Sequence, residues 1–514
     1  MKKKYYTLGI GILLVCTACT DWLTVQPETS VTAEILFTTD DGVKQGLNGA
    51  YYLAEQGVYN PIGALGGGGY NSFIEDMANT YDYSSAINSD SYFWSNHLYE
   101  QTTSQKTVNG NVFIKPYKII ANLNSLINEM IKNRDEITPE VYNIVRGEAL
   151  AFRACCHLDL LRIYGPVPSS VDAGKAYLPY VRVNDVNTYP YHTFDQYMEY
   201  VQADLDSAEV YLAKSEPVLT TTFESTESTW NTPWPYRRSR INYYGVLGLQ
   251  ARAALWRGDQ DKALRYAKLV KDAKNEDGTF KFRFTTPEDN LDNNNYSVTD
   301  LTHYTEHVCG VKCGSWFDAT RGTDSPWRYG EGTVISYNSI PFLKGLYGDN
   351  YEDDLRVKHF WKVVVNDRDT VKDPVTGEPI LTDWGSIQLI LTPRLYSIGR
   401  WDDFNRNATN AKRNFPIVRL PEMYFIIMEC GTLSEANEVY KEYCVARGIT
   451  YVPLTESDRK ERVIMESIKE YVGEGQNFFT YKRNDVRRMK GSQTDCSTKQ
   501  YIVPIPEGEA SIVK

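Results

Sequence analysis

The sequence lacks an apolar run long enough to cross a lipid bilayer. The apolar stretch Leu8–Val15 is short, whereas a membrane-spanning helix needs about 20 apolar residues. Mean hydropathy is −0.44, and the hydrophobic share of 42% is close to that of soluble globular proteins. We therefore expect a chain that folds around a sizeable core and does not span a membrane.

Positive charge is also scarce. The chain has 55 Lys and Arg residues against 66 Asp and Glu residues, which gives a net charge of −11. Such a surface repels a phosphodiester backbone, so we expect no nucleic-acid partner. The H-E-x-x-H, G-x-S-x-G, P-loop and Rossmann fingerprints are absent as well, and we expect neither catalysis nor a cofactor.

A glycoside hydrolase remains an alternative. Such an enzyme needs two carboxylates about 5–9.5 Å apart, and a sequence with 66 acidic residues cannot exclude such a pair. Aromatic side chains, by contrast, are abundant at 13% of the chain, including 38 Tyr and 10 Trp. This excess suits a protein that stacks flat or amphipathic ligands, although many of the rings will belong to the core.

The N-terminus has the pattern of a secretory signal. Three lysines and an apolar stretch precede Thr17, Ala18 and Cys19, which resemble the cleavage box of bacterial lipoproteins. A cut before Cys16 fits less well, because the branched Val15 would flank the cleaved bond. We expect Cys19 to carry the lipid anchor, with plain secretion as the alternative.

Three separate segments have helical periodicity. In the first, a helix over about 119–131 and a second one from Pro139 to Gly165 predict an antiparallel hairpin. The apolar stripe of the second helix consists of Val145, Ala149, Phe152, Cys156, Leu160 and Ile163.

The other two segments are also helix–turn–helix patterns. Residues 244–270 turn at Gly258 and resemble a tetratricopeptide unit, and residues 423–443 turn at Gly431, with Gly448 closing the second helix. Helical pairs cannot bury their faces alone and must stack. The intervening stretches 60–110, 215–240 and 280–415 are predicted to be loop-rich.

One stretch carries a family resemblance. Residues 147–154 (GEALAFRA) and 157–165 (HLDLLRIYG) resemble the signature helix of SusD/RagB-type nutrient-binding lipoproteins. Further landmarks follow in the family's order: Asp21-Trp22-Leu23, Gln26-Pro27, Leu47–Tyr51, Pro116–Asn122, Asp353–Arg356, Arg419–Tyr424, Phe478–Arg483 and Val503–Pro506. Two stretches depart from the pattern, at Met428–Cys430 and Glu466–Gly475.

The resemblance implies a fold and a function. The fold would be mostly α, a right-handed stack of four tetratricopeptide-like helical pairs with long, aromatic, loop-rich insertions. Residues 1–18 would be the signal peptide and 19–514 a single SusD-like domain, with pairs within about 35–165, 240–275 and 415–485. The protein would be lipid-anchored in the outer membrane, face the exterior, and pass a glycan or peptide to a SusC-like TonB-dependent β-barrel.

The resemblance also places the ligand site on loops before the signature helix and after the second pair. Sugars present apolar faces that stack on aromatic rings, while polar side chains set their orientation. The ligand-binding residues implied here are Asn71, Asp76, Tyr81, Tyr83, Tyr92, Trp94, Trp316, Asp318, Arg321, Trp327 and Tyr329. For each Trp, packing as a loop anchor is the competing interpretation.

Metal binding is weighed and not adopted. His303, His307, Cys309 and Cys313 could ligate zinc only if the segment folded back, and a Cys309–Cys313 disulfide is an alternative. The acidic run 349–354 lacks EF-hand spacing and is expected to be a solvated turn.

Two other readings stay open. The pairing of the remaining cysteines, including Cys430 with Cys444, is not set by the sequence. A helical-repeat scaffold that binds another protein is a further alternative function, because it would share this fold.

Overall fold

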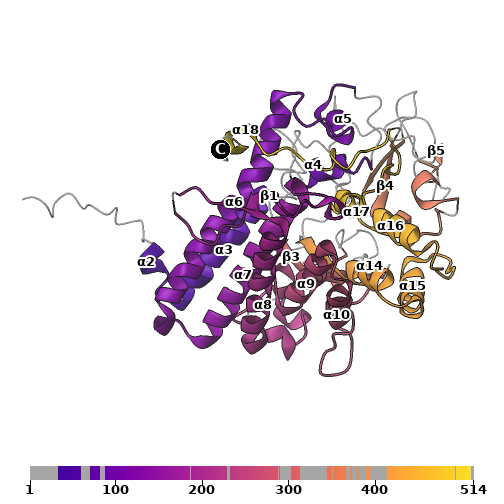
Figure 1. Ribbon diagram of the computed structural model, residues 1–514. Coiled ribbons are helices and arrows are strands. Elements are labelled where there is room, and N and C mark those ends of the chain that lie inside the picture. The colour runs from indigo at the N-terminus through magenta and orange to yellow at the C-terminus, as the bar shows by residue number, and fades with distance from the viewer. Residues whose placement is uncertain are drawn as a thin grey trace, which may run out of the picture.

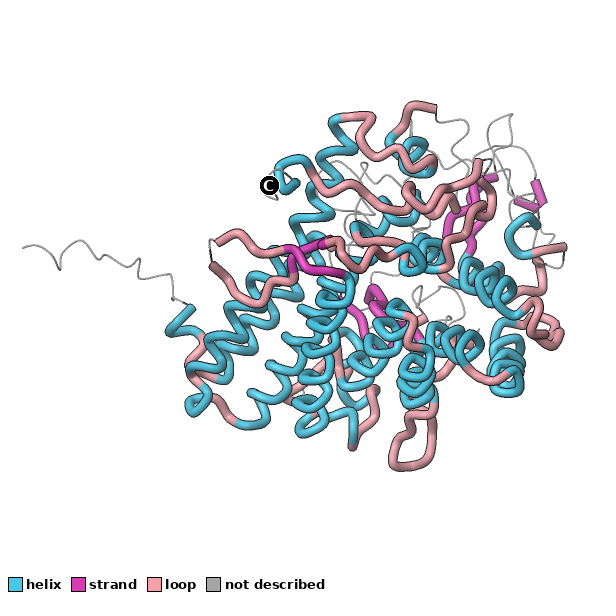
Figure 2. Tube along the Cα trace, viewed as in Figure 1, coloured by secondary structure: helices cyan, strands magenta, loops and turns pink. Residues whose placement is uncertain are grey.

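The computed structural model is mostly helical (Figure 1; Figure 2). It describes residues 33–58, 70–80, 87–185, 187–227, 232–286, 289, 303–312, 344–349, 351–365, 371–372, 379–380, 389–393, 414–492 and 494–510. The predicted signal peptide and Cys19 lie outside these residues. Within them, no helix combines the length and the apolar character needed to cross a bilayer.

Eight long helices form the body of the molecule, and each packs against the next along the chain (Figure 1). They are α3 (Asp40–Gly57), α6 (Thr103–Lys132), α7 (Pro139–Tyr164), α8 (Phe194–Ser215), α9 (Tyr243–Arg257), α10 (Gln260–Lys271), α14 (Leu420–Cys430) and α15 (Leu433–Arg447). Taken two at a time, they give the stack of helical pairs that was predicted.

The signature helix α7 is the most deeply buried of them. Pro139 stands at its first turn, Gly165 ends it, and most side chains from Val141 onward are buried, because other helices cover it on several sides. Its Gly147 lets α8 approach: a Cβ at this position would lie 2.7 Å from Cγ of Leu212. The predicted helix is confirmed at both ends.

Two helices differ from the sequence analysis. Helix α6 begins at Thr103 rather than near 119, because Thr102 and Gln105 form a capping box, and it continues through Pro116. Helix α8 was not predicted, although Thr193 and Gln196 form the same kind of box at its start. Its buried stripe is Phe194, Tyr197, Met198, Val201, Leu205, Ala208 and Leu212.

The two later pairs match their predictions. Gly258 adopts φ +90° between α9 and α10, and Gly448 adopts φ +65° after α15, which are backbone conformations that favour glycine. Cys430 and Cys444, on the two helices of the last pair, are both free thiols.

Further elements surround the body. The helices are α2 (Ala33–Leu36), α4 (Tyr70–Met77), α5 (Asp90–Ser95), α13 (Leu355–Phe360), α16 (Arg459–Glu470), α17 (Asn477–Arg483) and α18 (Glu507–Ala510). Single 3₁₀ turns occupy Arg134–Glu136, Pro168–Ser170, Pro217–Leu219, Glu224–Thr226, Arg237–Ser239 and Tyr304–Glu306. The stretch 60–110, expected as loop, thus contains α4, α5 and the start of α6.

The strands form two-stranded antiparallel ladders (Figure 2). They are β1 (Ala176–Pro179) with β2 (Tyr191–Thr193), β3 (His307–Lys312) with β8 (Asn414–Arg419), β4 (Trp361–Val365) with β7 (Leu389–Pro393), and β5 (Val371–Lys372) with β6 (Pro379–Ile380). Of these, β3 and β8 bracket residues 313–413, so they are the place where this long insertion leaves and rejoins the body.

Helix α9 lies directly against that ladder. A Cβ on Gly245 would lie 2.7 Å from Cβ of Cys309, and one on Gly248 would lie 2.9 Å from Cγ1 of Val418. The two glycines therefore let helix α9 pack closely against the side chains of β3 and β8 at the base of the insertion.

Candidate functional site

Most of the predicted ligand residues lie outside the described residues. These are Tyr81, Tyr83, Trp316, Asp318, Arg321, Trp327 and Tyr329. Asn71 belongs to α4, but its side chain is not among the described ones. Their role in ligand binding stays a prediction.

The three predicted residues with described side chains are Asp76, Tyr92 and Trp94, on the contacting helices α4 and α5. Trp94 is only 3% exposed, and its ring meets Phe73 edge-on with centroids 5.2 Å apart. Asp76 is likewise buried, whereas Tyr92 is half-buried against the core. In this arrangement Trp94 packs as a core residue, and Tyr92 is the ring that keeps some exposure.

The strands β3 and β8 form the base of the 313–413 insertion. We name the insertion edge as β3, β8 and the residues that hold them. His307 pairs with Arg419 at one end of the ladder, and Lys312 pairs with Asn414 at the other. Segments that carry Trp316 and Trp327 thus start from a fixed pair of strands.

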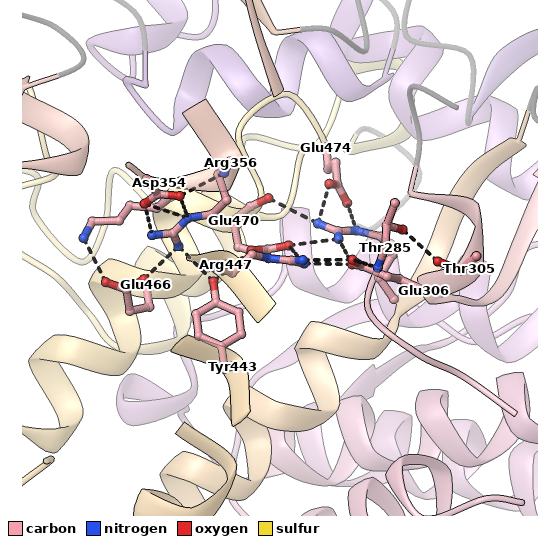
Figure 3. A network of polar contacts seen from close by, with 12 residues as sticks. Thr285, Thr305, Glu306, Asp354, Arg356, Tyr443, Arg447, Glu466, Glu470 and Glu474 are labelled. Carbon is pink, nitrogen blue, oxygen red and sulfur yellow. Dashed lines mark hydrogen bonds and ion pairs between the residues drawn. The ribbon is translucent and has the colours of Figure 1, made fainter. Parts of the chain in front are cut away.

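A buried ionic network anchors this edge (Figure 3). Glu306, which immediately precedes β3, accepts hydrogen bonds from Arg419 Nη1 at 2.6 Å and from Arg447 Nη2 at 2.9 Å. It also accepts one from the backbone N–H of Thr285 at 2.9 Å. These bonds tie the start of β3, the end of β8 and helix α15 together.

Glu470 at the end of α16 joins the same network. It accepts from Arg447 Nη2 at 2.6 Å, from Arg419 Nη1 at 3.0 Å and from the hydroxyl of Tyr443 at 2.8 Å. Burial alone would raise the pKa of Glu470, but the two guanidinium groups outweigh it and lower that pKa to about 2. Glu470 is therefore charged at every physiological pH.

The network continues to the acidic–Arg turn quoted in the sequence analysis. Arg356 donates to Asp354 Oδ2 at 2.6 Å, to Glu466 Oε2 at 2.7 Å and to the hydroxyl of Tyr443 at 2.8 Å. Lys469 donates to the other oxygen of Glu466 at 2.8 Å. Asp354 of the acidic run is buried and holds Arg356, whereas Asp349, Glu352 and Asp353 are exposed, as expected of a solvated turn.

The turn between α16 and α17 links the network to helix α4 near the N-terminal end of the chain. Glu474 accepts from Arg419 at 2.7 and 3.0 Å. The backbone N–H groups of its neighbours Gly473 and Gly475 donate to Glu75 of α4 at 2.9 and 3.0 Å. Burial raises the pKa of both Glu75 and Glu474 to about 7, because desolvation exceeds the stabilising bonds.

Of the four residues considered as zinc ligands, three lie among the described residues. His303, His307 and Cys309 are buried near the start of β3, and Cys313 lies outside the described residues. No group of three or more potential ligands suited to a metal ion occurs in the part of the chain that the structure describes. Cys309 is a free thiol in this structure.

Apart from Glu75, whose partners are backbone N–H groups, the carboxylates of the network each meet an arginine or lysine, an arrangement suited to holding segments in place. Arg356 and Arg419 belong to stretches quoted as landmarks, so the sequence pointed to them, whereas Glu474 lies in the stretch Glu466–Gly475 that departs from the family pattern. Glu306 and Arg447 were missed, since each is an isolated charge whose partners lie far along the chain. Glu306 and Arg419, for example, are 113 residues apart.

Comparison with known proteins gives a consistent result. Residues 21–227 match the family model SusD-like_3, described as starch-binding and associating with the outer membrane. No curated protein matches the sequence. Solved structures supply the similarity over the rest of the chain.

Three of these structures come from Bacteroides. A SusD superfamily protein of Bacteroides thetaiotaomicron is 18% identical, with a TM-score of 0.61 over 92% of this chain and 98% of the other. A SusD-like carbohydrate-binding protein of Bacteroides vulgatus is 17% identical, with a TM-score of 0.60 over 92% and 96%. A putative sugar-binding protein of Bacteroides vulgatus is 18% identical, with a TM-score of 0.60 over 92% of this chain and 96% of the other. At such identities the match concerns the fold.

Proposed function

We propose that the chain is a member of the SusD/RagB family and binds a nutrient polymer at the cell surface, with a glycan as the favoured ligand. It then delivers this polymer to a partner TonB-dependent transporter of the outer membrane. The proposal rests on the similarity to SusD-like and sugar-binding proteins and includes no catalytic step.

One observation carries the proposal. The aromatic-rich segment 313–413 leaves the body at β3 and rejoins it at β8, and Glu306, Arg419, Arg447 and Glu470 lock that junction. A binding loop needs such a base, because rings held in place lose less conformational entropy when they stack on a sugar. Loops on rigid scaffolds are where binding residues concentrate.

The first experiment tests the rings of the insertion. The variant Trp327→Ala should weaken retention of the bound polysaccharide by about 5- to 150-fold, since one stacking contact contributes about 1–3 kcal/mol. Affinity electrophoresis against a panel of polysaccharides and peptides measures this and also separates a glycan ligand from a peptide. The control is Tyr52→Ala, which removes a 61% exposed ring from α3 in the helical body.

Three results would contradict the proposal. Equal retention by Trp316→Ala, Trp327→Ala and wild type would remove the insertion from the site. Release of shorter sugars during long incubation would make the protein a glycoside hydrolase. Retention of other proteins but of no polymer would make it an interaction scaffold.

The lipid anchor has its own test. The variant Cys19→Ala should move the protein from the membrane fraction to the soluble fraction, because no acyl chain can be attached. Metabolic labelling with a fatty acid should mark wild type and leave the variant unmarked. A variant that stays in the membrane fraction contradicts the anchor.

A further inference from the structure

A concave site lies in the helical body, and none of its lining residues belongs to the 313–413 insertion. It is a pocket open to solvent and lined by residues of α7, α9, α14, α16 and α17. Helices α9, α14, α16 and α17 are neighbours at the C-terminal end of the stack in Figure 1.

The walls of the pocket are mostly apolar. Leu255 of α9, Ile426 of α14 and Ile464 of α16 contribute aliphatic surface, and Phe479 of α17 contributes a ring. Leu255 and Ile464 are only partly buried, so apolar groups remain open to a ligand there. A site of this kind matches the C–H face of a small ring.

Polar groups without partners also line it. Trp256 is 2% exposed and Tyr471 is 5% exposed. Neither the Nε1–H of Trp256 nor the hydroxyl of Tyr471 has a hydrogen-bond partner among the residues that the structure describes. Buried donors normally have an acceptor. An oxygen atom of a bound ligand could therefore accept a hydrogen bond from one of these two donors.

Two ion pairs supply a donor and an acceptor side by side. Arg252 binds Glu422 through Nε at 2.7 Å and Nη2 at 2.6 Å, and Arg483 binds Glu429 at 2.6 and 2.5 Å. The side chains of Glu422, Glu429 and Arg483 are 17–20% exposed. Each carboxylate oxygen keeps a lone pair, and each guanidinium keeps N–H groups beyond those used in its pair.

The charge of the lining argues against an anion. Arg252 and Arg483 are matched by Glu422 and Glu429, and Arg162 donates to Asp159 at 2.9 Å. A carboxylate or phosphate would meet no uncompensated positive charge. A hydroxyl group is different, because it can accept from an arginine and donate to the neighbouring glutamate at the same time.

We propose that this pocket binds one neutral sugar ring, held by its hydroxyl groups at the Arg252–Glu422 and Arg483–Glu429 pairs and by its C–H face against the apolar wall. The choice of a sugar rests on the function proposed above, whereas the pocket itself is separate from the insertion. The protein would then have a polymer site on its loops and a single-ring site in its helical body.

The test uses the whole protein with a panel of single sugars: glucose, galactose, mannose, xylose, arabinose, fucose and N-acetylglucosamine. Glucuronate, acetate and glycine serve as charged probes. Saturation-transfer NMR should detect at least one neutral sugar, and a crystal soaked with it should place the ring between the two ion pairs.

A blocking variant makes the test specific. Ile464→Phe fills the mouth of the pocket and should weaken binding of that sugar at least 10-fold. The matched control Val445→Phe adds the same bulk at a 75% exposed position of α15 and should bind as wild type does. Circular dichroism on both variants checks that the helices persist.

Each outcome has a definite meaning. Absence of every neutral sugar from the pocket, binding of charged probes alone, or full binding by folded Ile464→Phe overturns this inference. Retention of polymer with an empty pocket leaves the proposed function standing and removes only the second site. A sugar ring bound in the pocket of a protein that retains no polymer would support this inference and contradict the proposed function.

Discussion

The helical body and the insertion edge are held together in different ways. Within the body, side chains such as Phe152 and Leu160 of α7 fill apolar interfaces, and buried ion pairs stand in small groups, as Arg153 does with Asp204 at 2.6 Å. At the insertion edge, the charges of Glu306, Arg419 and Glu470 form part of one continuous network (Figure 3).

The difference follows from the backbone. A helix satisfies its own N–H and C=O groups, so its outer face can be apolar and close by packing alone. The segments around Glu306, Asp354 and Glu474 are short turns, which lack the regular backbone hydrogen bonding of a long helix. Directional bonds from arginine forks fix such segments, since each fork reaches several acceptors at once. The arginine side chains thus add fixed polar contacts to segments that lack regular helical hydrogen bonding.

The largest test of the difference between the two regions is a substitution of Arg447 in the network. The variant Arg447→Met should lower the free energy of unfolding by about 3–5 kcal/mol, because it leaves buried carboxylates short of a partner. Urea denaturation followed by circular dichroism measures the change. The control Arg488→Met removes a 59% exposed pair with Asp495 and should change stability by less than about 1 kcal/mol. Similar small effects for both variants would mean that the network does not hold the edge.

The contact between the two regions is probed at Gly245. The variant Gly245→Ala should destabilise the protein by about 1–3 kcal/mol, because the added methyl would lie 2.7 Å from Cβ of Cys309. This cost exceeds the gain of up to about 1 kcal/mol that alanine brings to a helix. A thermal melt with unchanged or raised midpoint would show that α9 and β3 tolerate a wider spacing.

The pH dependence of stability separates Glu474 from the rest of the edge. Its pKa in the folded protein is about 7 against the ordinary 4.5. Between these values the folded state binds a proton that the unfolded state lacks, so its contribution to stability falls as the pH rises through this window. Glu474→Gln should therefore lose less stability than wild type between pH 5 and pH 8.

Urea midpoints at several pH values give this difference directly. His97 and His157, whose burial lowers their pKa values to about 4 and about 3, act in the opposite direction but equally in both proteins. Parallel pH profiles for wild type and Glu474→Gln would contradict the raised pKa.

The smallest expected effect lies in the body itself. A Cβ on Gly49 of α3 would meet no atom within 4 Å. Gly49→Ala should raise the free energy of unfolding by about 0.5–1 kcal/mol, since alanine loses less backbone entropy in a helix. A loss of stability at Gly49 would mean that this face of α3 is covered in solution.

The helical pairs were the most predictable part of the fold. Their apolar stripes and their turns at Gly258 and Gly448 are local patterns, which a single sequence displays directly. Helix α8 could have been found from the box formed by Thr193 and Gln196, and the start of α6 from the box formed by Thr102 and Gln105.

The insertion edge was far less predictable. The pairing of β3 with β8 joins Lys312 to Asn414, and no local pattern specifies a partner at that separation. The ligand residues came from family resemblance alone, and Trp94 illustrates the limit of composition: the same ring can stack on a ligand or on Phe73. The pocket beside Trp256 escaped prediction because five separated stretches of the chain build it.

The bonds from Glu75 to Gly473 and Gly475 carry a consequence for the order of events during biosynthesis. The donor groups lie 398 and 400 residues further along the chain than the carboxylate they meet. A ribosome makes the N-terminal side first. Helix α4 therefore gains these two hydrogen bonds only after almost all of the remaining polypeptide has been made. Any truncation upstream of Gly473 removes both donors and leaves Glu75 without them.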